Sequence, residues 1–318
     1  MEWRCLLMLT FLNAFAADKI VYAANKIAPV DTARVIELIQ LSNQLHWTDP
    51  SHSLDYADNA LKLAQDIGYQ KGIALSHNAK GFCFWSFGDN DLAIEAALQA
   101  LEMGKKENDL SIQTESYYIL ARGYMDLNER LKSEEFIAKA EQLARQTQSG
   151  IQLCNIYNLK GVIKFIAGQQ DSALLYYTKA YETGKSNKVD PIQFPRIISN
   201  IGECYSSENP TLAFTYFKQA LSLAKETQNK IAEASITDII GHAYLRKDDL
   251  RNAEMHLQAA LELARKLGLR RVIRHAYAGL VDIRLKQGRG NEAVQYQQQY
   301  YAVRDSLLST GLSSTGFI

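Results

Sequence analysis

A stripe of small residues recurs along the chain at helical spacing. The segment 53–64 and five later segments each begin 40 residues after the one before, and a seventh copy begins at Ala293. In the first six segments the twelfth residue is Ala or Gly, and the eighth is always Ala: Ala60, Ala100, Ala140, Ala180, Ala220 and Ala260. Spacings of three and four residues place side chains on one face of a helix. Each segment is therefore predicted to be a helix that a second helix approaches closely.

A second helix is predicted upstream of each of these segments. A small residue lies 11 or 12 residues before the next segment begins, at Gly81, Ala121, Gly161, Gly202 and Gly241. Turn signals separate the two helices of a unit, for example at Gly88, Asn128 and Gly168. Each 40-residue unit therefore predicts a helical hairpin.

This pattern resembles the tetratricopeptide repeat, which has L-G-x-x-Y on its first helix and A-x-x-x-F on its second. The run 240–244 (IGHAY), followed by Ala253 and Leu257, is the closest copy, and the resemblance covers about residues 31–308. It implies an all-α fold, a right-handed α-solenoid of seven stacked hairpins. The unit has 40 residues here, against about 34 in the family, so we expect the extra residues to be shared between the two helices.

The two ends of the chain differ from the repeats. Residues 5–16 are apolar apart from Thr10 and Asn13, and small residues follow, so residues 1–23 are expected to be a secretory signal peptide. The alternative is a buried first helix. No later segment approaches 18 apolar residues, so we expect no membrane span in the mature chain. Residues 309–318 are rich in small and polar residues and are expected to form a disordered tail.

Charge and cysteine content narrow the classes of partner. Lys plus Arg and Asp plus Glu are both 35, and this neutral balance gives no electrostatic case for nucleic acid or for an anionic membrane. Without residues 1–23, the cysteines are Cys83, Cys154 and Cys204, which have no short spacing. They predict buried free thiols rather than a disulfide framework or a zinc knuckle.

No recognised catalytic motif occurs in the chain, so we expect neither an enzyme nor a bound cofactor. The sequence has no H-E-x-x-H, G-x-x-x-x-G-K-[ST], G-x-S-x-G or C-x-x-C. His242 and His275 are predicted on first helices of adjacent repeats, with Asp238 four residues before His242. A metal site is one interpretation of these three residues. Metal-free polar groove residues are favoured, because no two histidines are four residues apart.

The resemblance implies that the first helices line a concave groove in which a partner binds. Positions three before, one after and four after the small residue of each first helix face that groove. The candidate partner-binding residues are Asn78, Phe82, Trp85, Tyr118, Arg122, Met125, Asn158 and Phe165. Asn78 and Asn158 are similar to asparagines that hold a partner's backbone in peptide-binding members, and Arg122 would pair with a carboxylate. The alternative for the aromatic residues is packing between neighbouring helices.

These features together predict a non-enzymatic scaffold that binds a protein or peptide segment. With residues 296–307 (YQQQYYAVRDSL), they resemble the extracytoplasmic sensor region of tetratricopeptide-containing sensor histidine kinases of Bacteroidetes. The resemblance implies an exported, periplasmic sensory region of a two-component-type protein, or a shortened relative of one, since no kinase motif follows. The alternative is a free-standing periplasmic or cytoplasmic assembly scaffold. The oligomeric state is left open.

Overall fold

The protein is a stack of seven helical hairpins, seen in a computed structural model that describes residues 32–313 and their side chains as far as Val303. In chain order the pairs are α2 (Thr32–Leu45) with α3 (Pro50–Asp66), α4 (Gln70–Phe87) with α5 (Asn90–Lys106), α6 (Leu110–Asp126) with α7 (Arg130–Gln146), α8 (Gly150–Ile166) with α9 (Gln170–Ser186), α10 (Phe194–Cys204) with α11 (Pro210–Glu226), α12 (Lys230–Arg246) with α13 (Leu250–Lys266), and α14 (Arg270–Lys286) with α15 (Gly290–Ser313). No strand occurs within residues 32–313, so the predicted all-α solenoid of seven hairpins is confirmed.

The 40-residue period arises from two helices of equal length. The helices α5, α6 and α7 each have 17 residues, and short turns separate them. A residue with positive φ recurs every 20 residues along most of the chain, as at Gly88, Asn108 and Asn128. The backbone N–H of the residue after each positive-φ residue donates to the carbonyl five residues before it. For example, the Asp89 N–H donates to the Phe84 carbonyl at 2.9 Å, and this hydrogen bond caps the C-terminus of the helix. The extra residues are thus shared between both helices, as expected.

The fifth repeat departs from this regular pattern. A short 3-10 turn, η1 (Pro191–Gln193), precedes α10, which has only 11 residues. Pro191 and Pro195 both lie at this helix start. Proline has no backbone N–H and is tolerated only in the first turn of a helix. The first helix of this repeat is therefore shorter than its counterparts.

The recurring small residues lie where helices cross. All six alanines at the eighth position have no exposed surface. A Cβ on Gly161 would lie 2.4 Å from the Tyr177 ring, and one on Gly184 would lie 2.7 Å from Phe194. These separations are well inside van der Waals contact, so the predicted close approach of the two helices is confirmed.

Replacing Ala180 with Leu is expected to lower the free energy of unfolding by about 1–3 kcal/mol, because extra methylene groups overpack a filled core. Ala180 is fully buried among Tyr177, Ile197 and Phe217. Chemical denaturation of the variant measures the change. The exposed Leu175 on the same helix offers a control, since Leu175→Ala should leave the midpoint almost unchanged. An unchanged midpoint for Ala180→Leu would contradict the packing.

The three cysteines in the described region are buried and free, as predicted. Burial raises the pKa of each thiol to about 11, so the thiols are protonated and unreactive near neutral pH.

Among the described residues, no helix is both long and apolar enough to cross a membrane.

The expected features of the two termini fall largely outside the described residues. The expected signal peptide, residues 1–23, lies outside them entirely. The helix α15 continues to Ser313, so residues 309–313 are helical where a disordered tail was expected. The remainder of that tail, residues 314–318, also lies outside the described region.

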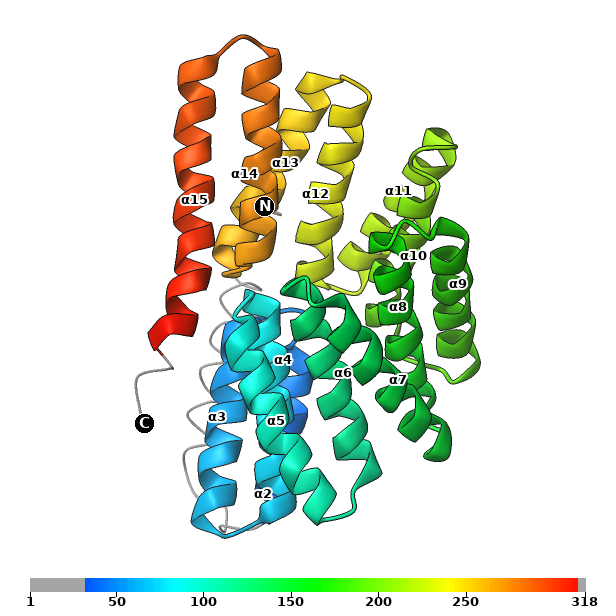
Figure 1. Cartoon of the computed structure of the whole chain (residues 1–318), viewed down its shortest axis with the longest axis vertical. Helices are drawn as coiled ribbons and strands as arrows, with labels where there is room; N and C mark the ends of the chain where they lie inside the picture. Colours follow the sequence, from blue (N-terminus) through cyan, green and yellow to red (C-terminus); the bar gives the residue numbers. More distant parts are fainter. Residues whose placement is uncertain (1–31, 314–318) are drawn as a thin grey trace, which may run out of the picture.

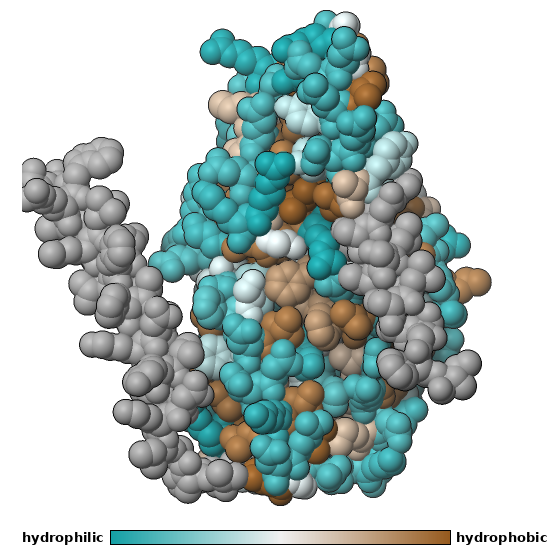
Figure 2. Space-filling view, turned by 90° about the vertical axis from the view of Figure 1, so that its left-hand side faces the viewer, coloured by the Kyte–Doolittle hydropathy of each residue, from teal (hydrophilic) through white to brown (hydrophobic). Residues whose placement is uncertain are grey.

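The stack curves until its last repeats stand against its first ones (Figure 1). In Figure 1, α12 and α14 rise from the ends of α4 and α6 rather than continuing away from them. Figure 2 shows the side nearest α15, where apolar side chains gather along the middle of a mostly hydrophilic face. The curvature therefore encloses surface that an open solenoid would leave exposed.

Candidate functional site

The solenoid closes because its C-terminal repeats contact its N-terminal repeats directly. The N–H of Ile231, at the start of α12, donates to the carbonyl of Trp47, in the turn between α2 and α3, at 3.3 Å. Arg271 Nη1, at the start of α14, pairs with Asp126 Oδ2, at the end of α6, at 2.5 Å. The helix α15 also contacts α5. These contacts turn the expected open groove into an enclosed interior.

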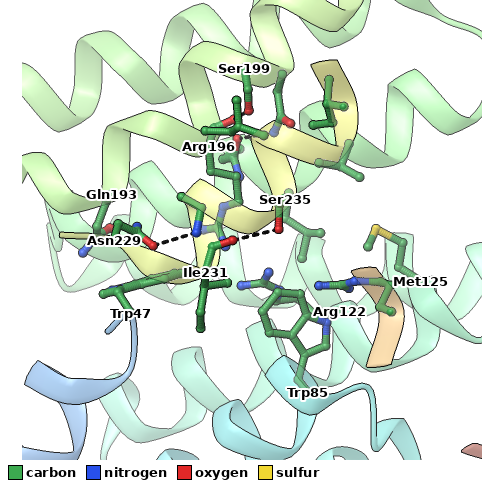
Figure 3. A pocket seen from close by; sticks show the side chains of 18 of the residues that line it. Trp47, Trp85, Arg122, Met125, Gln193, Arg196, Ser199, Asn229, Ile231 and Ser235 are labelled. Carbon is green, nitrogen blue, oxygen red and sulfur yellow. Dashed lines mark hydrogen bonds between the residues drawn. The ribbon is translucent and has the colours of Figure 1, made fainter. Parts of the chain in front are cut away.

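The interior holds a cavity of about 260 Å³ (Figure 3). The first helices of repeats two to seven all contribute to its wall. Most of that wall is apolar, and its larger apolar side chains include Trp47, Trp85, Met125, Val162, Ile231 and Ile239. A mostly apolar cavity with a few polar groups is typical of a ligand site.

Three arginines line this cavity, and no carboxylate of the described residues does. Arg271 is paired with Asp126, which also accepts a hydrogen bond from Trp85 Nε1 at 3.0 Å. Arg122 and Arg196 have no ion-pair partner in the described part of the chain. Arg122 is buried and Arg196 is half-buried, and a charge out of water without a partner is unfavourable, so an anion in the cavity would stabilise both side chains.

Arg122 is the most enclosed of these arginines, with 5% of its surface exposed. Its guanidinium carbon lies 3.1 Å from the Trp85 ring centre, and Nη1 donates to the Tyr118 hydroxyl at 2.8 Å. Its Nε is buried and has no hydrogen-bond partner. Burial, with repulsion from Arg196 and Arg271, lowers the pKa of Arg122 to about 9. The guanidinium group is therefore stacked on Trp85 and hydrogen-bonded to Tyr118, and no carboxylate of the described residues pairs with it.

Arg196 reaches the same cavity from α10, and Figure 3 shows it approaching from a different side than Arg122. Its guanidinium carbon lies 5.0 Å from the centre of the Trp47 ring. Its Nε is also buried without a hydrogen-bond partner. Two guanidinium groups without an ion-pair partner among the described residues thus line one cavity, an arrangement suited to a carboxylate.

Two buried asparagines in the wall pair with each other. Asn200 Nδ2 donates to Asn158 Oδ1 at 3.0 Å. This leaves the Asn158 amide N–H groups and the Asn200 carbonyl oxygen without partners among the described residues. A donor and an acceptor side by side match the backbone groups of an extended peptide.

Asn78, which resembles Asn158 in repeat position, is engaged differently. Its Nδ2 donates to the carbonyl of Ile112 at 3.1 Å, and its Oδ1 accepts from Ser116 Oγ at 2.9 Å. Both polar ends therefore link α4 to α6 within the fold.

A second cavity, of about 430 Å³, shares Trp47 and Gln193 with the first. It is also lined by His46 and Glu115. Burial raises the pKa of the Glu115 carboxyl to about 7 and lowers the pKa of the His46 imidazole. Near pH 7 His46 is therefore neutral and Glu115 is only partly ionised, so this cavity carries little charge.

The eight predicted groove residues are divided between the first cavity, the second cavity and a position outside both. Five line the first cavity: Trp85, Tyr118, Arg122, Met125 and Asn158. Asn78 and Phe82 line the second. Phe165 lines neither and lies half-buried against the core of repeats four and five. Phe82 also packs on Trp47, with ring centres 5.5 Å apart, so it combines cavity lining with packing between repeats one and two.

Several residues of the cavity were not identified in the sequence analysis, and three of them are large side chains whose positions have separate explanations. Trp47 lies in a turn, outside the first-helix positions considered. Arg196 lies six residues before Gly202, in the irregular fifth repeat. Arg271 lies in the first turn of α14 and reaches the cavity only because the C-terminal repeats contact the N-terminal ones. Repeat positions alone carry no signal for any of these three.

Comparisons with known proteins agree with this architecture. Residues 238–267 match the tetratricopeptide repeat family model. No characterised protein matches the chain at the level of sequence. A Rap protein complexed with competence and sporulation factor is similar, with 14% identity and a TM-score of 0.68 over 87% of this chain and 74% of that one. NprR in complex with its cognate peptide NprX is 16% identical, with a TM-score of 0.66 over 95% and 88% of the two chains.

A third similar structure is the Rap conjugation gene regulator of the plasmid pLS20 in complex with the Phr* peptide. It is 11% identical, with a TM-score of 0.66 over 81% of this chain and 70% of that one. At these identities the likeness concerns the fold. The chain therefore has the helical-repeat solenoid fold of tetratricopeptide type, and one of its repeats matches that family directly.

Proposed function

We propose that the chain is a non-enzymatic scaffold that binds a short peptide segment inside its closed interior, anchored by a carboxylate. The observation that carries this proposal is the cavity lined by three arginines and no described carboxylate. Arg122 and Arg196 both line this cavity and have no ion-pair partner among the described residues. A carboxylate between them would complete both guanidinium groups with charge-assisted hydrogen bonds. The carboxylate belongs to the C-terminus or to an acidic side chain of the segment.

The rest of the cavity suits the remainder of such a segment. The free amide groups of Asn158 and Asn200 would pair with its backbone. Trp47, Trp85 and Met125 would receive an apolar side chain. Large aromatic residues in desolvated pockets commonly supply most of the binding energy at such sites.

Peptide binding here is proposed to have a regulatory role. Structures of similar fold hold NprX and Phr* peptides, which supports a peptide as the partner. The cavity wall includes residues from both ends of the solenoid, such as Trp47 and Arg271. A ligand that prefers the closed ring would stabilise it, so occupancy would be transmitted to the outer surface as a change in closure.

The test is affinity selection from four pools of short random peptides. Two pools include Asp and Glu and two lack them; within each pair, one pool has free C-termini and the other has amidated C-termini. Peptides should be retained from the three pools that contain a carboxylate and not from the amidated pool that lacks Asp and Glu. Equal retention from that last pool, or no retention from any pool, would contradict the proposal.

We further propose that this scaffold is the exported sensory region of a two-component-type signalling protein or a shortened relative of one. The support is the apolar run at residues 5–16, which is followed by small residues. The mature protein is then expected to lack its first 16 or 23 residues. Intact mass of the protein from a periplasmic fraction measures this directly. An unprocessed N-terminus in protein recovered from the cytoplasm would favour the free-standing cytoplasmic scaffold instead.

A further inference from the structure

Three side chains with metal-binding atoms converge on the first helices of repeats six and seven. Asp238 and His242 lie four residues apart on α12, and His275 comes from α14. Each offers one ligand atom, and these atoms all lie within 4.8 Å of one another. The sequence favoured a metal-free interpretation because no two histidines are four residues apart. Stacking of the repeats supplies the proximity that local spacing lacks.

The geometry centres on one buried carboxylate. His275 Nδ1 is hydrogen-bonded to Asp238 Oδ2, and His242 Nε2 lies 3.7 Å from Asp238 Oδ1. The two imidazole ring centres are 4.0 Å apart. The Asp238 side chain is 5% exposed, and its Oδ1 is buried without a hydrogen-bond partner. Asp238 Oδ1 is therefore a buried oxygen without a hydrogen-bond partner beside the two imidazoles, a position that a cation would satisfy.

His242 is held against the next repeat by close packing. A Cβ on Gly279 would lie 2.8 Å from His242 Cε1, so the imidazole occupies space that any other residue at position 279 would fill. His242 Nε2 lies 3.2 Å from the backbone carbonyl of His275, which directs it toward α14. The donor atoms are therefore positioned before any ligand arrives, which reduces the ordering cost of binding.

We propose that Asp238, His242 and His275 form a zinc-binding site joining repeats six and seven. Two imidazole nitrogens and one carboxylate oxygen are a ligand set that zinc commonly takes, with a fourth position left for water or a partner group. Zinc would displace the hydrogen bonds of His275 Nδ1 with Asp238 and of His242 Nε2 with the His275 carbonyl, release the displaced protons to solvent, and bond to all three side chains. The His275 side chain is 57% exposed, which gives an ion access from solvent. None of the three lines the peptide cavity, so the site is independent of the proposed peptide binding.

The experiment uses the full chain after removal of metal with a chelator. Zinc chloride is titrated by calorimetry, and cobalt(II) replaces zinc to give a visible absorption spectrum of its coordination. We expect one ion per chain. We expect His275→Gln and His242→Gln each to weaken zinc binding at least about tenfold, because ligand loss costs at least as much as loss of a supporting residue. His275 is exposed, so its variant should keep the wild-type circular dichroism spectrum even if His242→Gln does not fold.

The chain offers a matched control in a second Asp–His pair. His52 Nδ1 lies 2.6 Å from Asp49 Oδ2 at the start of α3, in a pair that the metal-ligand cluster does not include. His52→Gln should bind zinc as the wild type does. The inference is overturned if the wild type binds no stoichiometric zinc. It is also overturned if folded His275→Gln binds zinc with unchanged affinity.

Discussion

Replacing Arg122 with Met is expected to remove carboxylate-anchored peptide binding while leaving the ligand-free chain as stable as the wild type or more stable. In the free protein, Arg122 is 5% exposed, carries a buried unpaired Nε and has no ion-pair partner among the described residues. Apolar replacement of such a charge is often neutral or stabilising, because it removes a desolvation cost. Met has a similar length and packs flexibly.

The effect on binding has the opposite sign. Loss of one partner from a desolvated charge pair costs about 2–5 kcal/mol, which corresponds to a dissociation constant at least about thirtyfold higher. Melting temperature and calorimetric titration with a peptide from the selection measure the two effects. Arg251→Met, at an exposed position on α13, is the matched control and should change neither. Wild-type affinity in Arg122→Met would show that the carboxylate is held elsewhere.

Replacing Trp85 with Ala is expected to lower the free energy of unfolding by about 3–5 kcal/mol, as for other large buried aromatic residues. Trp85 is 4% exposed and lies where the N-terminal repeats of the closed solenoid meet its C-terminal repeats. The guanidinium carbons of Arg122 and Arg271 lie 3.1 Å and 4.5 Å from its ring centre. Its Nε1 donates to Asp126, which is also the partner of Arg271. Truncation of Trp85 therefore removes core packing and also weakens the contact between the first and last repeats of the solenoid.

Trp85→Phe separates these contributions. It keeps an aromatic ring for most of the packing and loses the donor to Asp126 together with part of the indole, so its destabilisation should be at least about 1.5–3 kcal/mol, the usual range for a hydrogen bond to a charged group, and smaller than that of Trp85→Ala. Denaturant titration measures the free energy of unfolding of both variants, and small-angle scattering measures whether the closed solenoid opens. A change below about 1 kcal/mol for Trp85→Ala would contradict the packing of Trp85 between the halves.

The repeat architecture was predictable because its determinants are local and periodic. Ala140, Ala180 and Ala220 mark the helix crossings directly, and Gly88 and Asn128 mark turns within hairpins. The turns between repeats were harder to see. Their positive-φ residues include Gln148, Lys188 and Gln228, which are not typical turn formers. There the helix ends are imposed by stacking of the repeats.

Closure of the ring was not predictable from the repeat pattern. The ion pair between Arg270 and Asp89 joins residues 181 positions apart, and the one between Arg271 and Asp126 joins residues 145 apart. These contacts depend on the accumulated curvature of the stack, which small rotations per repeat determine. An open groove was expected for this reason, and Arg196 and Arg271 were not recognised as part of the site.

The two asparagines show why equivalent repeat positions differ in role. Asn78 and Asn158 were assigned the same role from their shared position before the small residue of the first helix. In the structure, Ser116 and the Ile112 carbonyl on the neighbouring helix bind both ends of the Asn78 amide. Asn158 instead meets Asn200, which leaves its N–H groups available. The neighbouring repeat thus decides which asparagine is free to bind a partner.

The central claim is that the partner lies inside the closed solenoid, and photo-crosslinking tests it most directly. A selected peptide carrying a photoreactive apolar residue is irradiated with the full chain, and the crosslinked residues are identified by mass spectrometry. The account predicts crosslinks to Trp85, Met125 or Ile239, on the inner wall of the cavity. Crosslinks confined to the second helices of the repeats, such as α5, α7 and α9, would contradict it.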